Sequence, residues 1–73
     1  MNILYATNCP KCKIIKGRLE YLNIKYKLID NVDDIKKFNT DNNLKGVPTL
    51  LIDDHILDFN EAMKYLNIKE SRR

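Results

Sequence analysis

The chain has 73 residues, of which 44% are hydrophobic and 32% are charged, and its formal net charge at pH 7 is +3. This length allows one small domain, which we expect to span residues 1–73. The chain lacks an apolar run of the roughly 20 residues that a membrane-spanning helix needs, and its basic residues do not form the dense stripe typical of nucleic-acid binding. We therefore expect neither membrane nor nucleic-acid partners.

The first part of the chain predicts a strand, a helix and a second strand. Residues 1–6 are mostly apolar, which indicates a short buried strand. Pro10 suits the first position of a helix, because its ring fixes φ and no N–H donor is needed there. The helix should continue over 11–22, where apolar residues recur at helical spacing. Polar and apolar residues then alternate over 25–29, which is typical of a strand.

A second helix and a β-hairpin should follow. Asn31 is a suitable N-cap, and an apolar helical face follows it as far as the turn-forming residues at 39–43. The apolar segments 49–52 and 55–57 are separated by two aspartates, which predicts two strands joined by a tight turn. This hairpin would add antiparallel strands to the parallel pair formed earlier in the chain.

The last segment predicts a helix with a marked start. Asp58 and Glu61 resemble a capping box, and apolar residues at helical spacing follow them. We expect the polar tail from about 69 to 73 to be frayed. The complete order is β-α-β-α-β-β-α, which predicts an α/β fold with a four-stranded mixed sheet and helices on both faces.

The candidate catalytic residues are Cys9 and Cys12, the only cysteines in the chain. At the start of a helix that follows a strand, two thiols at this spacing can close a disulfide without breaking the helix. The partial positive charge of the helix N-terminus stabilises a thiolate on Cys9. We therefore expect Cys9 to attack a substrate disulfide and Cys12 to resolve the mixed disulfide, as in a thiol-disulfide oxidoreductase.

Metal binding is the rival interpretation of the same pair. Two thiolates suit Cu(I), and small copper carriers of similar length also place a cysteine pair after a first strand. However, no methionine lies near the pair in the sequence, and the chain ends in a helical pattern where the carrier fold ends in a strand. A structural zinc site needs four ligands, so it would require a metal-bridged dimer, and within one chain we expect no metal site. A third class, an interaction module without catalysis, would not need both cysteines.

Two motifs together carry a family resemblance. Cys-Pro-x-Cys occupies 9–12, and Val47-Pro48 precedes the third predicted strand. With these motifs and this order of elements, nearly the whole chain resembles a glutaredoxin-like protein of the thioredoxin superfamily. The resemblance implies a thioredoxin-like fold of the glutaredoxin type, a cis peptide bond before Pro48, and backbone hydrogen bonds from Val47 to a bound peptide or glutathione. It also implies that Pro10 and Lys11, between the cysteines, contact the substrate.

The chain departs from that family where glutathione is held. Many glutaredoxins carry a basic residue three positions before the first cysteine, where this chain has Ala6. The family's glycine pair after the fourth strand is replaced by Leu57 and Asp58, and its usual tyrosine between the cysteines is replaced by Lys11. Asp58 remains a candidate for a polar contact with the substrate, besides its capping role. Both glutathione and an enzyme of the thioredoxin-reductase type therefore stay open as the reductant.

The expected partners are disulfide-containing proteins, among which ribonucleotide reductase and peroxide-handling enzymes are candidates. We expect a monomer that holds no cofactor. The N-terminus has no basic region followed by an apolar stretch, which predicts the absence of a signal peptide and a cytoplasmic location. In that compartment a lone cysteine pair is more often catalytic or metal-binding than structural.

Overall fold

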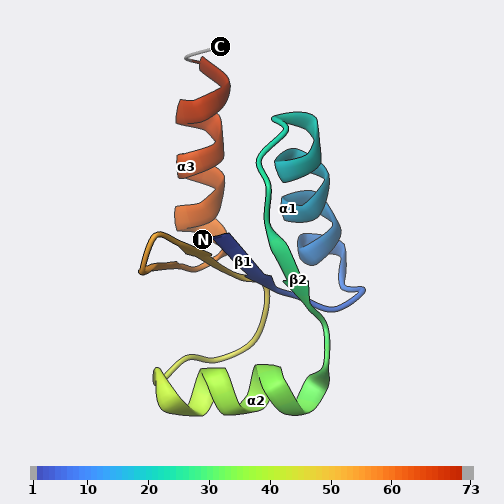
Figure 1. The fold of residues 1–73 in the computed structure, drawn as a ribbon, viewed down its shortest axis with the longest axis vertical. Helices are drawn as coiled ribbons and strands as arrows, with labels where there is room; N and C mark the ends of the chain where they lie inside the picture. Colours follow the sequence, from blue (N-terminus) through green and yellow to red (C-terminus); the bar gives the residue numbers. More distant parts are fainter. Residues whose placement is uncertain (1, 72–73) are drawn as a thin grey trace.

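Four strands and three helices follow one another in the predicted order, in a computed structural model that describes residues 2–71 (Figure 1). None of these helices is both long and apolar enough to cross a membrane. In chain order the elements are β1 (Asn2–Tyr5), α1 (Pro10–Tyr21), β2 (Lys27–Ile29), α2 (Val32–Asp41), β3 (Thr49–Ile52), β4 (His55–Leu57) and α3 (Phe59–Ser71).

The four strands form one mixed sheet in the order β2-β1-β3-β4. Strand β1 pairs with β2 in parallel and with β3 antiparallel, so Leu4 has Leu28 on one side and Leu50 on the other. Strand β4 returns antiparallel to β3, through the tight turn at Asp53 and Asp54. The predicted mixed sheet of four strands is therefore confirmed.

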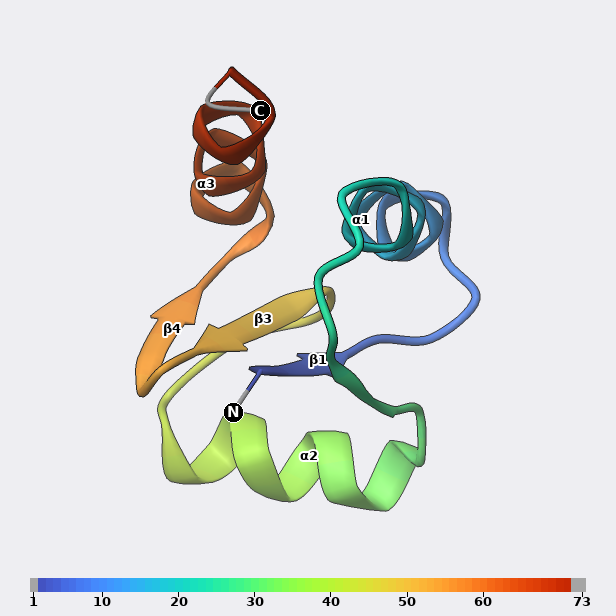
Figure 2. The same cartoon turned by 45° about the horizontal axis from the view of Figure 1, so that its top comes forward.

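Helices cover both faces of this sheet, as predicted. Figure 2 shows α1 and α3 on one face and α2 on the other. Because side chains alternate along a strand, Leu4 packs under α1 and α3 while its neighbour Tyr5 stacks on Phe38 of α2, with 3.9 Å between the ring centroids. Burial of each large aliphatic side chain is worth about 1.5–3 kcal/mol. The main core lies between the sheet and the α1–α3 pair, and consists of Leu4, Ala6, Cys12, Ile15, Leu19, Leu50, Ile52, Ala62 and Leu66.

Helix α1 begins and ends at residues that the sequence marks. Cys9 is its N-cap, and Pro10 takes the first helical position. After the helix, Asn23 adopts a left-handed conformation with φ of 58°, and the N–H of Ile24 donates to the carbonyl of Leu19 at 2.9 Å. A left-handed residue of this kind closes a helix end, because it turns the chain while the last carbonyls keep their donors.

Helix α2 begins as predicted but continues further than expected. The side chain of Asn31 accepts hydrogen bonds from the N–H groups of Asp33 and Asp34, at 2.8 and 3.4 Å. The helix then runs to Asp41, into the segment that was expected to be a turn. Its last turn is held by the side chain of Asn39, which donates to the carbonyl of Gly46 at 3.2 Å. This bond links α2 to the loop that leads into β3.

Helix α3 continues into the polar tail of the chain. The structure keeps the helix to Ser71, past residue 69, where fraying is expected to begin. Fraying of the tail stays a prediction, and the last two residues lie outside the described part. The guanidinium of Arg18 on α1 donates to Asn67 and to Glu70, both at 2.6 Å. These bonds tie the last turns of α3 to α1, and the local polar composition did not reveal them.

Candidate functional site

The two cysteines lie at the N-terminus of α1 and form a disulfide with each other. Their Cα atoms are 5.1 Å apart, which is within the usual range for a disulfide. The N–H of Cys12 donates to the sulfur of Cys9 at 3.1 Å, so Cys9 caps the helix through its sulfur. This N–H would stabilise negative charge on Cys9 once the disulfide opens, as the position at the helix start predicts.

Cys9 and Cys12 differ in how far they are exposed to solvent. Cys9 is partly exposed, whereas Cys12 is 1% exposed and belongs to the main core. An incoming disulfide can therefore reach Cys9 more easily than Cys12. This geometry agrees with Cys9 as the attacking thiol and Cys12 as the resolving thiol, although the order itself stays a prediction.

Thr7 contacts the buried cysteine, and the sequence did not single it out. Its backbone N–H donates to the sulfur of Cys12 at 3.4 Å, and its hydroxyl oxygen lies 3.9 Å from the same sulfur. In the sequence, Thr7 indicated only the end of the first strand. The signal that could have found it is its place in the short connection between β1 and Cys9, where the chain must turn past the cysteine pair.

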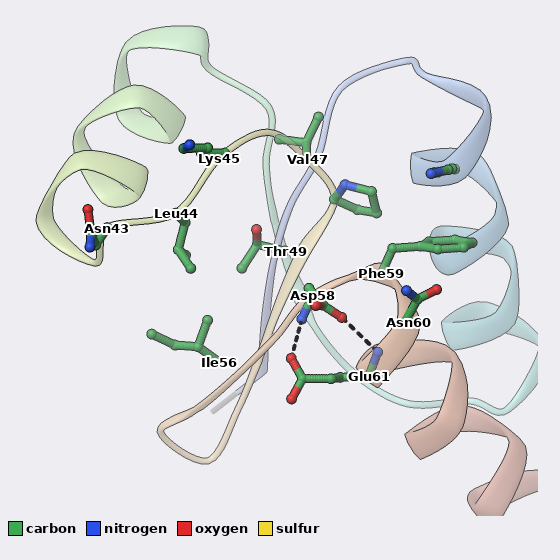
Figure 3. Close-up of a pocket in the computed structure, with 12 residues that line it drawn as sticks. Asn43, Leu44, Lys45, Val47, Thr49, Ile56, Asp58, Phe59, Asn60 and Glu61 are labelled. Atoms are coloured by element: carbon green, nitrogen blue, oxygen red, sulfur yellow. Dashed lines mark hydrogen bonds between the residues drawn. The ribbon is translucent and has the colours of Figure 1, made fainter.

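A cavity of about 420 Å3 gathers most of the predicted substrate-contacting residues. Lys11 from α1, Val47 and Pro48 from the loop before β3, and Asp58 from the start of α3 all line it. Figure 3 shows Val47 and Asp58 among the lining residues. The peptide bond between Val47 and Pro48 is cis. Pro10 is exposed beside the cysteines but does not line this cavity. Three segments that are distant in sequence thus meet in one groove, and one of them is the disulfide-bearing helix α1.

At the α3 end of this groove, two lining residues are hydrogen-bonded to each other. The N–H of Glu61 donates to the Asp58 carboxylate at 2.8 Å, and the N–H of Asp58 donates to the Glu61 carboxylate at 3.3 Å (Figure 3). The predicted capping box is therefore confirmed. Nearby, the ammonium of Lys11 lies 5.2 Å from the ring centroid of Phe59, which is a cation–π distance.

Several solved structures share this whole architecture, although no family model and no curated protein matches the chain. A mutant of the thioredoxin-like protein BC3987 matches with a TM-score of 0.75 at 26% identity, over 92% of this chain and 99% of that one. A second BC3987 structure gives 0.74 at 25% identity, over 90% and 99%. Glutaredoxin 1 from Francisella tularensis, in complex with cacodylate, gives 0.73 at 26% identity, over 99% of this chain and 96% of its own.

These matches span nearly the full length of both partners, and the cysteine pair closes at the start of the first helix. The chain has the thioredoxin-like fold and is similar to thioredoxin-like and glutaredoxin proteins. The fold supports thiol-disulfide oxidoreductase chemistry at Cys9 and Cys12. The strand order and the order of the elements also confirm the fold class that the sequence predicted, from the first parallel pair of strands to the last helix.

A second cavity of about 360 Å3 borders the cysteine pair through Cys12. Cys12 and Thr7 line it together with the exposed lysines Lys13 and Lys16 of α1. Its remaining walls come from the β1–α1 loop, β2 and the start of α2, through Ala6, Asn8, Leu28, Asp30 and Val32. Cys12 is therefore buried in the core on one side and borders a solvent-accessible hollow on the other.

The copper-carrier interpretation does not fit the glutaredoxin-like fold, because the chain ends in α3 and not in a strand. Within residues 2–71, no group of three or more histidine, cysteine, aspartate and glutamate side chains is placed to hold a metal. His55, on the outer strand β4, lines neither of the two cavities beside the cysteines. A metal-bridged dimer, which would take ligands from two chains, stays a prediction.

Proposed function

We propose that this glutaredoxin-like protein reduces disulfides in other proteins by cycling between the Cys9–Cys12 dithiol and the disulfide. The single observation that carries the proposal is the hydrogen bond from the N–H of Cys12 to the sulfur of the more exposed Cys9, at the start of α1. That arrangement supplies a stabilised thiolate where a substrate can reach it, with a second thiol three residues away to finish the exchange.

The reaction takes two exchange steps. The Cys9 thiolate attacks one sulfur of the substrate disulfide, so that a Cys9–substrate disulfide forms and the other substrate sulfur leaves as a thiolate. Cys12 then loses its proton and attacks the Cys9 sulfur. The Cys9–Cys12 disulfide forms, the mixed disulfide breaks, and the second substrate sulfur leaves and takes up a proton. Two electrons have then passed from the protein to the substrate.

The groove beside the cysteines is proposed to hold the substrate chain. Val47 and Pro48 form part of its wall, and Lys11 and Asp58 also line it. An extended peptide laid along this wall would receive backbone hydrogen bonds from Val47, as the family resemblance implies, while Pro10 and Lys11 contact the residues around its cysteine. Disulfide-containing proteins, with ribonucleotide reductase as one candidate, are the proposed partners, and we propose that the protein acts as a monomer.

Contacts in the same groove also affect which reductant can bind there. Glutathione carries carboxylates, which are favoured at the N–H groups of a helix start. At the start of α3, however, the N–H groups of Asp58 and Glu61 already donate to the carboxylates of these two residues. A ligand carboxylate at these two N–H groups would have to displace the side chains, and anywhere at this helix start it would meet their negative charges. Together with Ala6 in place of a basic residue, this favours an enzyme of the thioredoxin-reductase type as the reductant in the proposed cycle.

Two measurements test this proposal. Mass spectrometry after mild oxidation of the reduced protein should show the loss of two hydrogen atoms, and the absence of an intramolecular disulfide would refute the redox function. The oxidised protein is then offered thioredoxin reductase with NADPH in one cuvette, and glutathione with glutathione reductase and NADPH in another. We expect faster NADPH consumption in the first cuvette, with insulin as the disulfide substrate in both.

A further inference from the structure

Two hydrogen-bond donors of Thr7 lie near the sulfur of Cys12, which attacks in the second step of the proposed cycle. The backbone N–H of Thr7 is 3.4 Å from the Cys12 sulfur, and the hydroxyl oxygen is 3.9 Å from it. Cys12 itself is 1% exposed, and the hollow of about 360 Å3 that it borders is also lined by Thr7. Thr7 therefore stands where the buried sulfur meets solvent.

We propose that Thr7 stabilises the Cys12 thiolate and so sets the rate at which the mixed disulfide is resolved. The inference deepens the proposed function and rests on it, because only a dithiol cycle contains this step. Its physical reason is that a charge on a nearly buried sulfur is unfavourable unless hydrogen-bond donors face it. The Thr7 hydroxyl and N–H are the two donors that the structure places against this sulfur.

The step itself is the second exchange of the cycle. Cys12 gives its proton to solvent in the bordering hollow, and its thiolate attacks the Cys9 sulfur of the mixed disulfide. The Cys9–Cys12 bond forms, the bond between Cys9 and the substrate sulfur breaks, and the leaving sulfur carries away the electron pair. While Cys12 is charged, the Thr7 hydroxyl can turn its hydrogen toward the sulfur, whereas a neutral thiol would need this donor less.

The sulfurs of the two cysteines accept hydrogen bonds from different donors. The effect of Thr7 should therefore be confined to the step in which Cys12 attacks. Cys9 receives the N–H of Cys12, whereas Cys12 receives the N–H and the hydroxyl of Thr7. Removal of the hydroxyl should therefore slow resolution and leave the first attack by Cys9 unchanged. A general loss of structure would slow both steps.

The test follows the reaction of the reduced protein with Ellman's reagent, 5,5′-dithiobis(2-nitrobenzoate), by stopped flow. The coloured thiolate leaves once when Cys9 attacks, and again when Cys12 resolves the mixed disulfide. For Thr7→Val, which keeps the shape and the N–H, the loss of one hydrogen bond to a charged group predicts a second phase slowed about tenfold at pH 7. The pH at which that phase reaches half its maximum should rise by about one unit. The reason is that the Cys12 thiolate forms only in a more basic solution when it has fewer hydrogen-bond donors.

Two further variants separate chemistry from structure. Thr7→Ser keeps the hydroxyl and should restore the wild-type second phase, and Thr40→Val makes the same change at an exposed position of α2 and should alter neither phase. A wild-type second phase and pH profile in Thr7→Val would overturn the inference, as would a Thr7→Ser variant as slow as Thr7→Val. If the wild-type protein shows only the first phase and closes no disulfide, the proposed function itself fails, which is a different result.

Discussion

Asp58 and Glu61 cap each other at the start of α3, each carboxylate accepting the backbone N–H of the other residue at 2.8 and 3.3 Å. This reciprocal pair does more than begin a helix, because both residues also line the groove beside the cysteines. Two of the donors that this helix start would offer to an anionic ligand, the N–H groups of Asp58 and Glu61, are thus used within the protein. The proposed preference against glutathione therefore rests on the same two side chains that cap the helix.

The first prediction concerns glutathione. Wild-type protein should turn over a glutathione mixed disulfide much more slowly than a neutral mixed disulfide made with 2-mercaptoethanol. Glu61→Ala frees the N–H of Asp58 and removes one negative charge, so it should raise kcat/KM for the glutathione substrate relative to the neutral one. Both are measured by coupled NADPH consumption.

The matched control for this prediction is Glu20→Ala, which removes an exposed glutamate from α1. It should leave the ratio of the two kcat/KM values unchanged. Loss of the cap should also lower the free energy of unfolding of Glu61→Ala by about 1 kcal/mol, so folding is checked by circular dichroism. Efficient wild-type turnover of the glutathione substrate would contradict the interpretation of the groove.

The second prediction concerns the order of attack. Cys9→Ser should abolish reductase activity, whereas Cys12→Ser should accumulate a mixed disulfide that mass spectrometry detects on Cys9. The reason is that Cys9 is partly exposed and receives the N–H of Cys12, while Cys12 is buried. A thiol-alkylating reagent at pH 6 should therefore modify Cys12→Ser faster than Cys9→Ser. Equal rates in the two single variants would show that the assigned order is wrong.

The third prediction compares two neighbouring isoleucines on α1. Ile15 is 0% exposed in the main core, whereas Ile14 is 46% exposed on the outer face of the helix. Ile15→Ala should lower the free energy of unfolding by about 2–5 kcal/mol, because it removes buried methyl groups and leaves a cavity. Ile14→Ala is the control for the same change in helix propensity, and urea titration should show a loss of less than about 1 kcal/mol. Similar losses in both variants would contradict the packing described for α1.

The fourth prediction concerns the last turns of α3. Arg18→Met removes the donors to Asn67 and Glu70 but keeps much of the length of the side chain. Because these side chains are partly exposed, the overall loss of stability should not exceed about 1 kcal/mol. The larger effect should be local, with faster amide hydrogen exchange near residue 70 than in wild type. Lys16→Met, an exposed position on the same helix, should not change that exchange, and unchanged exchange in Arg18→Met would refute the role of Arg18.

Local sequence signals located the elements of the fold well, and they failed where distant contacts intervene. Asn31 and the Asp58–Glu61 pair each act within one helical turn, and both caps lie where their residue types and spacing predict. Helix α2 ends later than its turn-forming residues predict. Asn39 near the end of α2 bonds to a partner outside its helix, and the last turns of α3 bond to Arg18 of α1. Composition within the turn does not encode such partners.

The sequence by itself determined the order of the elements and the position of two thiols at a helix start, because strand alternation, helical periodicity and capping act over a few residues. Only the tertiary structure decided which distant residues meet. It brings Lys11, Val47 and Asp58 to one groove, and it sets Thr7 against the sulfur of Cys12. The reason is that these contacts depend on how α1 and α3 pack on the sheet, and no local pattern records that packing.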